Sequence, residues 1–242
     1  MLTVWGRKTS SNVQALMWCI GELELPYKRL DFGHRYGGTD TDEFYRLNPN
    51  RTVPVIQDGC NPPLWETGAI LRYLANRYAK GNFWPDEILA RTEVDRWMEW
   101  SKLNVALAFT APIFWQVART PKESQDINSI KLAIDKFENN LMIAEEILAS
   151  RNYFVFIPEE KRSLSLVDYF KIESENVTRQ FKLNKDNEWV AGDNFTLADI
   201  FLSHTLLWAR LCHVNLSPTI NDYIDRAISR RSYIQAQEKN NL

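Results

Sequence analysis

The chain has 242 residues, of which 45% are hydrophobic and 25% charged, an ordinary globular composition with room for one large domain or two smaller ones. The formal net charge of −2 excludes the strong positive field that binding to nucleic acid or to an anionic membrane surface requires. No stretch approaches the roughly 18 consecutive apolar residues of a membrane-spanning helix, and the first residues lack the pattern of a secretion signal. We therefore expect a soluble cytoplasmic protein.

Residues 1–80 predict alternating strands and helices. A short strand at 2–5 leads through a polar loop rich in helix-capping residues into an apolar helix that Pro26 ends. The elements expected next are a strand at 27–32, a short helix at 42–47, a strand at 53–56 headed by Pro54, a short strand at 64–65 and a helix after Thr67. This βαβαββα order is a thioredoxin-like pattern.

Glycine, asparagine and proline interrupt the pattern at 79–86, which predicts an interdomain linker. Everything after it favours helices, at 88–115 and 124–150 in particular, and Pro112 should kink or shorten the first of these.

A strong helix start follows near residue 196. Thr196 is placed as the N-cap, with Asp199 reaching back to it from the first turn, and Phe195 and Ile200 are placed as a hydrophobic staple. We interpret Asp199 as a structural cap and not as a catalytic carboxylate.

The segment from 48 to 74 carries the strongest indication of a binding site. Pro54 cannot donate a ladder hydrogen bond, so a proline at the head of an apolar run marks a strand start or edge. Glu66 and Thr67 precede an apolar pattern at helical spacing, so the free N–H groups of that helix start are available to a carboxylate. The segment resembles the glutathione-binding half of a glutathione transferase.

This resemblance covers nearly the whole chain and is nearest to bacterial theta-like and beta-like cytosolic transferases. It implies an α/β plus all-α fold, with an N-terminal thioredoxin-like domain at 1–80 and a C-terminal helical bundle domain at 87–242. The chain departs from the family at about 152–188, where an insert is expected to pack against the helical domain or a partner. The resemblance also implies a homodimer, in which the thioredoxin-like domain of one subunit packs against the helices of the other.

The same resemblance assigns the binding residues. A cis bond between Val53 and Pro54 would turn the main-chain N–H and C=O of Val53 toward the cysteinyl part of glutathione. Glu66 would hold the γ-glutamyl ammonium group and Thr67 the neighbouring carboxylate. These residues are otherwise explained as a turn and a helix start.

The glycine carboxylate of glutathione has no obvious partner. Thr52 stands where family members often have lysine or arginine, and Arg51 replaces the usual glycine before it. Arg51, or Arg35 in the glycine-rich loop at 33–38, is left to supply the cation.

A transferase must lower the pKa of the glutathione thiol from about 8.5. A hydroxyl donor beside a helix N-terminus does so, and the active-site serine of theta-like and delta-like transferases corresponds to Ser10. Ser11 and Asn12 are near enough to exchange roles with it, and Thr9 is a further alternative. The simpler interpretation is that Ser10 or Ser11 caps the helix.

Other chemistry is not indicated. The three histidines have no metal-ligand spacing with Cys19, Cys60 and Cys212, and this odd, scattered set of cysteines fits a reducing compartment. A Cys-x-x-Cys motif is absent, which argues against thiol transfer. Trp115 is expected to border a hydrophobic pocket.

We therefore expect a glutathione transferase with glutathione as co-substrate and a small hydrophobic electrophile. The alternatives are a non-catalytic protein-interaction module with the transferase fold, and a glutathione-dependent disulfide reductase.

Overall fold

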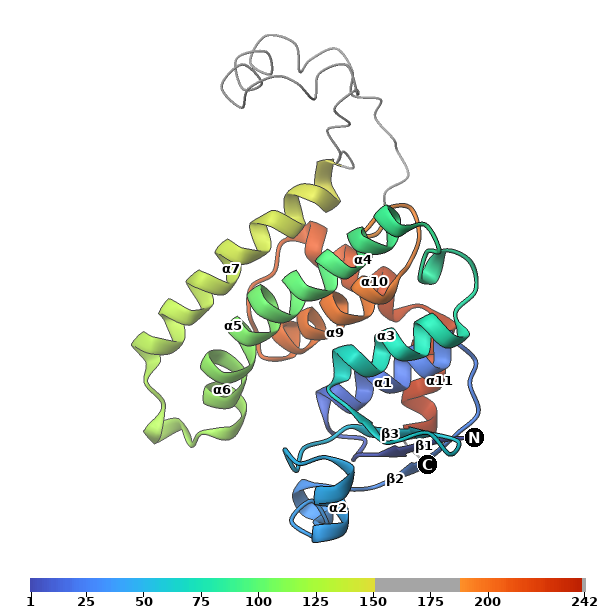
Figure 1. Ribbon diagram of the computed structural model, residues 1–242. Helices are drawn as coiled ribbons and strands as arrows, with labels where there is room; N and C mark the ends of the chain where they lie inside the picture. Colours follow the sequence, from blue (N-terminus) through green and yellow to red (C-terminus); the bar gives the residue numbers. More distant parts are fainter. Residues whose placement is uncertain (151–187, 241–242) are drawn as a thin grey trace, which may run out of the picture.

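The computed structural model describes residues 1–150 and 188–240. The insert expected at about 152–188 therefore lies almost wholly outside the described residues. The described chain forms a mixed α/β unit at its N-terminal end and a larger helical unit above it in Figure 1, as the sequence predicts.

A four-stranded sheet with flanking helices makes up the N-terminal domain. Its elements are β1 (Leu2–Trp5), α1 (Ser11–Glu22), β2 (Tyr27–Leu30), α2 (Asp42–Leu47), β3 (Val55–Asp58), β4 (Leu64–Trp65) and α3 (Thr67–Tyr78). The strand order is β2-β1-β3-β4, with β1 parallel to β2 and the other pairs antiparallel. Parallel neighbours need a crossover connection, and α1 provides it. The predicted βαβαββα order is confirmed, with β3 beginning just after Pro54.

Helix α1 is buried on nearly all of its faces. Every residue from 15 to 20 is buried, because α1 contacts α3, α9 (Leu197–Leu211) and α11 (Arg231–Asn240). A helix that is apolar all round belongs in the interior of a protein. The start of α1 is thereby held in a fixed position between the two domains.

The linker expected at 79–86 contains a short 3-10 turn, η2 (Gly81–Phe83). Trp84 anchors it: this side chain is buried, and its Nε1 donates to Asn76 Oδ1 at 2.9 Å.

Helices alone form the described part of the second domain. Besides α9 and α11, its elements are α4 (Ile88–Trp100), η3 (Ser101–Ala106), α5 (Leu107–Phe109), η4 (Thr110–Trp115), α6 (Gln116–Arg119), η5 (Lys122–Ser124), α7 (Ile127–Ser150) and α10 (Pro218–Ile228). The run from α4 to α6 continues through η3 and η4 as π-type turns. Pro112 lies in η4 and cannot donate an intrahelical bond, so the expected disturbance of this helix takes the form of a widened turn.

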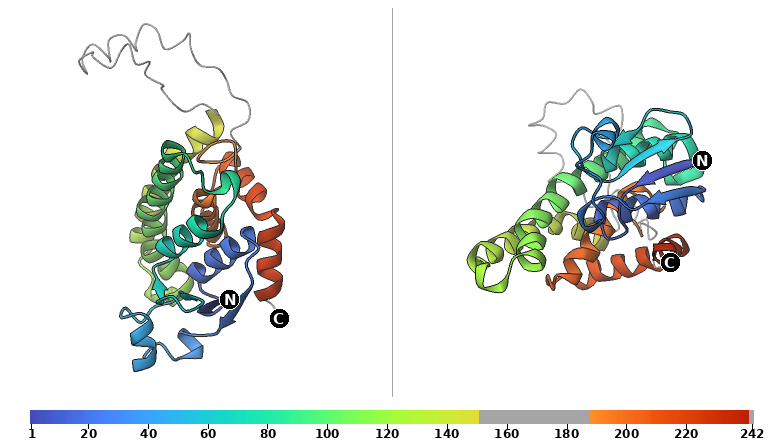
Figure 2. Two further views of the ribbon diagram at one scale, coloured as in Figure 1. Left: turned by 45° about the vertical axis from the view of Figure 1, so that its right-hand side comes forward. Right: turned by 90° about the horizontal axis from the view of Figure 1, so that it is seen from below.

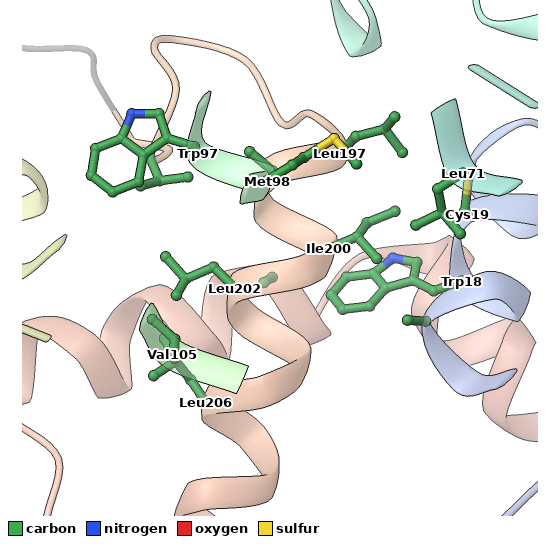
Figure 3. Packing of buried hydrophobic residues seen from close by; sticks show 14 of the residues in the cluster. Trp18, Cys19, Leu71, Trp97, Met98, Val105, Leu197, Ile200, Leu202 and Leu206 are labelled. Carbon is green, nitrogen blue, oxygen red and sulfur yellow. The ribbon is translucent and has the colours of Figure 1, made fainter. Parts of the chain in front are cut away.

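Helix α9 is the centre of the hydrophobic core (Figure 3). Figure 3 shows Ile200 directed toward Trp18 of α1, while Val105 lies beside Leu202 and Leu206. Both domains therefore pack on the same helix, and the wall that α9 presents to the N-terminal domain is rigid.

Asp199, in the first turn of α9, is fully buried. Its carboxylate accepts hydrogen bonds from Thr196 N at 2.8 Å, Thr196 Oγ1 at 3.0 Å, Val190 N at 3.0 Å and Tyr223 Oη at 2.9 Å. Burial raises the pKa of Asp199 to about 6, and these four donors oppose the rise. Both halves of the predicted capping box are present, so the interpretation of Asp199 as a structural cap is confirmed.

The last described helix, α11, runs back along α1 (Figure 2). It brings the end of the described chain beside the N-terminal domain. None of the helices in the described ranges combines the length and the hydropathy that crossing a membrane would require.

Candidate functional site

A cleft of about 570 Å³ lies where the N-terminal domain faces the helical domain. Its N-terminal wall consists of three loops, at 7–10, 33–39 and 51–53, and of the starts of α1 and α3. Its helical wall consists of residues from η3 to α6 and of α9. The site is thus built from segments that are far apart in sequence.

The start of α1 brings the three predicted catalytic residues to the cleft. Ser10 occupies the N-cap position and is buried, while Ser11, the first helical residue, and Asn12 are exposed at its mouth. The Ser10 side chain makes no capping hydrogen bond to α1, so its hydroxyl is not committed to the helix. The alternative in which Ser11 caps the helix is wrong, because Ser11 lies inside it. Thr9 also lines the cleft.

Backbone bonds hold this loop in place. Ser10 N donates to Arg7 O at 3.1 Å, and Gln14 N donates to Ser10 O at 2.9 Å. The Gln14 side chain reaches back to Lys8 O at 3.0 Å. The Ser10 hydroxyl and the first N–H groups of α1, at the positive end of the helix dipole, therefore face the cleft together.

The bond between Val53 and Pro54 is cis, as the resemblance implies. Val53 lines the cleft, and its N–H and C=O make no backbone hydrogen bond among the described residues. Buried Asn48 secures the turn by donating from Nδ2 to Thr52 O at 2.9 Å and Thr52 Oγ1 at 3.1 Å. Thr52 lines the cleft, whereas Pro54 is buried behind it. Val53 is thus free to bond a peptide ligand in the manner of an added strand.

Glu66 and Thr67 lie together on the cleft at the start of α3. Glu66 has φ 68° and ψ 113°, a conformation that residues other than glycine adopt rarely and that often marks a binding site. Its exposed carboxylate is 4.0 Å from Lys102 Nζ. Thr67 is buried, and its N–H group belongs to the free first turn of α3.

The two candidate arginines differ in position. Arg35 does not line the cleft; it donates to Tyr36 Oη at 3.0 Å and lies over that ring. Its neighbour His34, with φ 51°, faces the cleft instead. Arg51 lines the cleft while its guanidinium donates to Thr41 O at 2.9 Å. Of the two, Arg51 is the one that lines the cleft.

The helical wall is mostly aromatic. Phe109, Phe114 and Trp208 line it, together with Trp115 as expected. Trp115 is 57% exposed, so an apolar surface is open to the cleft rather than buried in the core. Such a surface suits an apolar ligand.

His204 of α9 also lines the cleft. From the sequence alone, the histidines suggested a function only as possible metal ligands. His204 is 5% exposed, and its Nε2 accepts from Trp208 Nε1 at 3.3 Å. Its Nδ1 has no partner in hydrogen-bond geometry among the described residues, although the Ser11 main chain lies beside the ring. Burial lowers the pKa of His204 to about 4, and the Ser11 main chain opposes the fall. The imidazole is therefore neutral at pH 7.

Positive charge predominates among the side chains that line the cleft. Four cationic side chains line it, Arg7, Arg51, Lys102 and Arg119, against one carboxylate, that of Glu66. Within the described ranges no cluster of histidine, cysteine, aspartate or glutamate suited to a metal ion occurs. Cys19, Cys60 and Cys212 do not line the cleft, and burial raises the pKa of the Cys19 thiol. The site therefore favours a bound anion over a metal ion or a cysteine nucleophile.

Comparison with known proteins agrees with this geometry. Family models for the "Glutathione S-transferase, N-terminal domain" and the "Glutathione S-transferase, C-terminal domain" match residues 1–76 and 154–231. The chain is 33% identical to glutathione S-transferase GstB of Escherichia coli K12 over 155 residues, which are 64% of this chain and 74% of that protein.

Among solved structures, the chain is similar to the theta class glutathione S-transferase of Xanthomonas axonopodis pv. citri with glutathione bound. The TM-score is 0.74 at 29% identity, covering 97% of this chain and 96% of that one. Its fold is also similar to that of Ure2p in complex with glutathione, with a TM-score of 0.76 at 19% identity, covering 98% and 94%.

Proposed function

Because this chain belongs to the glutathione S-transferase family, we propose that it binds glutathione in the cleft and joins it, through its thiolate sulfur, to small electrophiles. The observation that carries the proposal is the meeting of three features on one cleft wall: the uncommitted Ser10 hydroxyl, the unpaired main chain of Val53 and the start of α3 at Glu66 and Thr67. The glutathione-bound relative from Xanthomonas supports it.

Glutathione lies extended along this wall. Its cysteinyl main chain bonds the N–H and C=O of Val53 beside the cis turn at Pro54. Its γ-glutamyl ammonium group pairs with Glu66, and the neighbouring carboxylate takes the Thr67 hydroxyl and the first N–H groups of α3. Each ligand group thereby meets a protein group of complementary charge.

The glycine carboxylate lies at the other end of the tripeptide. Arg51 is the cation we assign to it in preference to Arg35, because Arg51 lines the cleft beside Thr52. The Thr52 hydroxyl, already bonded to Asn48, accommodates this end as a second contact.

The thiol then faces the start of α1. A hydrogen bond from the Ser10 hydroxyl and the positive end of the α1 dipole stabilise the thiolate, which lowers the thiol pKa. The thiol proton passes to solvent, the sulfur forms a bond with the electrophilic carbon, and the leaving group departs with its electron pair. Ser11 and Asn12, at the mouth, are secondary donors.

The electrophile binds against the aromatic helical wall. Phe109, Phe114, Trp115 and Trp208 offer an apolar surface opposite the start of α1, where a small apolar ring is held near the thiolate.

Assembly as a homodimer is part of the proposal. Trp65 of β4 and the leucines Leu103 and Leu107 are exposed, the leucines at 56% and 60%. Exposed apolar side chains of this size are common at subunit interfaces. We assign them to the contact between the thioredoxin-like domain of one subunit and the helices of the other.

The test is ultraviolet difference absorbance for thiolate on adding reduced glutathione at neutral pH. The native chain should show a thiolate band that Ser10→Ala removes. Glutathione binding without such a band would contradict the transferase activity and favour a non-catalytic interaction module. Turnover of a mixed disulfide without turnover of carbon electrophiles would favour the disulfide reductase.

A further inference from the structure

Arg7 and Arg119 are the two cleft arginines that the binding of glutathione does not use. Arg7 lies in the loop after β1, where its main-chain N donates to Phe32 O at 3.1 Å. Its Nη1 lies 3.3 Å from the position that a Cβ on Gly33 would occupy, so the guanidinium lies beside the loop at 33–39 that lines the cleft. Arg119 ends α6, with its guanidinium 5.9 Å from the centre of the Phe114 ring. The two side chains come from opposite walls.

Neither guanidinium is paired with a carboxylate or bonded through its side chain within the described residues. Arg7 is partly buried and Arg119 is exposed, whereas two other partly buried arginines are paired, Arg230 with Glu22 at 2.7 Å and Arg210 with Asp225 at 2.7 Å. Desolvation and the charge of Arg119 both lower the pKa of Arg7. Two like charges on one cleft repel each other until an anion lies between them.

The remaining cations of the cleft already have partners. Lys102 faces Glu66 at 4.0 Å, and Arg51 is bonded to Thr41 O and lies 3.7 Å from Asp42. The two carboxylates of glutathione are assigned to the start of α3 and to Arg51. A third anionic group is needed to balance Arg7 and Arg119.

The electrophile is the molecule that can supply it. Arg119 stands next to the aromatic wall formed by Phe114 and Trp115, so an apolar body against that wall brings an attached anion within reach of the guanidinium. Guanidinium groups bind carboxylates through paired N–H donors. They also offset the repulsion between an anionic electrophile and the glutathione thiolate.

We propose that the preferred electrophiles are small apolar molecules that carry a carboxylate, which Arg7 and Arg119 bind from the two walls of the cleft. This inference rests on the proposed transferase function and names the substrate class of the same site. With an aryl chloride as the electrophile, the thiolate sulfur bonds to the carbon that bears chlorine, the C–Cl bond breaks, and chloride leaves with the electron pair. The thiol proton goes to solvent.

The test uses two aryl chlorides with the same reacting ring, the anionic 4-chloro-3,5-dinitrobenzoate and the neutral 4-chloro-3,5-dinitrobenzamide. Comparing them isolates the effect of the carboxylate charge on the enzymatic rate. For each probe, kcat/KM of the full chain is divided by the rate constant of the uncatalysed reaction with glutathione, which corrects for the different reactivity of the two rings. We expect kcat/KM on this scale to favour the benzoate by about tenfold or more, the effect of one charge-assisted pair. Raising the salt concentration should reduce that preference.

The variants are Arg7→Met and Arg119→Met, which keep an unbranched, flexible side chain in place of the arginine stem and remove the guanidinium charge. Each should lower kcat/KM for the benzoate by about tenfold and for the benzamide by less than about twofold. Arg46→Met is the matched control, because Arg46 is exposed on α2 and does not line the cleft. It should change neither rate.

Three results would overturn the inference. Turnover of both probes without a preference for the benzoate would refute it and leave the transferase function standing. A rise in the KM for glutathione in Arg7→Met, with both probes affected equally, would assign Arg7 to the glycine carboxylate instead. No turnover of either probe would refute the proposed function and this inference with it.

Discussion

Glu22 and Arg230 form an ion pair with two hydrogen bonds although 208 residues separate them. Arg230 Nε lies 2.7 Å from Glu22 Oε1, and Nη2 lies 2.8 Å from Oε2. The same carboxylate accepts from Ser232 Oγ and from Trp18 Nε1. Hydrogen bonding to Glu22 raises the pKa of Arg230. The pair ties the end of α1 to the start of α11 and so holds the last helix against the N-terminal domain.

Glu22→Gln should destabilise the protein by about 1–3 kcal/mol, because the amide replaces a paired, mostly buried carboxylate and leaves Arg230 without its counter-charge. Urea denaturation gives the free energy of unfolding. Asp225→Asn is the control: it removes the partner of Arg210, but the carboxylate is 64% exposed, so a loss of at most about 1 kcal/mol is expected. Equal losses in the two variants would contradict the proposed role of the pair.

Asp199→Asn should be more costly, at about 2–4 kcal/mol. All four groups bonded to the Asp199 carboxylate are donors, and an amide NH₂ among them leaves buried N–H or O–H groups unsatisfied. Glu87→Gln removes a capping carboxylate that is bonded to Leu89 N and Ala90 N on the surface of α4. That control should lose less stability than Asp199→Asn, because the Glu87 carboxylate is exposed to solvent. If both variants unfold at the same urea concentration, the Asp199 network is not the determinant of the α9 start.

His204 should make stability sensitive to acid. The pKa of His204 is lowered from 6.5 to about 4 in the folded protein, so as the pH falls the unfolded chain binds the proton first. The contribution of the neutral imidazole to the free energy of unfolding is therefore complete above pH 6.5 and is lost as the pH falls toward 4. The full effect is about 3 kcal/mol at most. The raised pKa of Asp199 acts in the opposite direction over a similar range.

The comparison that isolates His204 is therefore between the native chain and His204→Gln, measured by urea denaturation at pH 7 and pH 5. The difference in the free energy of unfolding between the native chain and His204→Gln should be smaller at pH 5 than at pH 7, or the variant should become the more stable protein at pH 5. A difference that is independent of pH would show that the imidazole remains protonatable in the folded protein.

Ser10→Ala should leave stability within about 0.5 kcal/mol of the native chain, because the Ser10 side chain makes no capping bond. Ser217→Ala is the matched variant, since Ser217 Oγ accepts from Ile220 N at the start of α10, and it should lose about 1 kcal/mol. The transferase rate should fall in Ser10→Ala and stay unchanged in Ser217→Ala, which is the reverse of the expected effects on stability. A loss of stability in both variants would reassign Ser10 to helix capping.

The double variant Leu103→Glu, Leu107→Glu should dissociate the proposed homodimer, because it places charge on exposed apolar surface of the helical domain, outside the cleft. Sedimentation velocity would show a dimer for the native chain and a monomer for the variant. Leu132→Glu alters a leucine of α7 that is equally exposed, at 69%, and should remain dimeric. A native monomer would refute the assembly.

Local features of this protein follow from the sequence with little ambiguity. The βαβαββα order, the Asp199 cap and the helices after residue 87 arise from apolar periodicity and from proline, glycine and capping residues, which act over a few neighbouring positions. For the same reason Ser10, Val53, Glu66 and Thr67 were identifiable, since each belongs to a turn or a helix start.

Only tertiary structure decided what faces these residues. Arg119 and His204 had no local signal of function, because their positions depend on how α6 and α9 are placed around the cleft, across from the N-terminal domain. The backbone conformation of the loop likewise decided that His34, with its positive φ, lies on the cleft and that Arg35 does not. Periodicity reports which side chains share a face of one element, whereas a site between domains depends on contacts between elements that are distant in sequence.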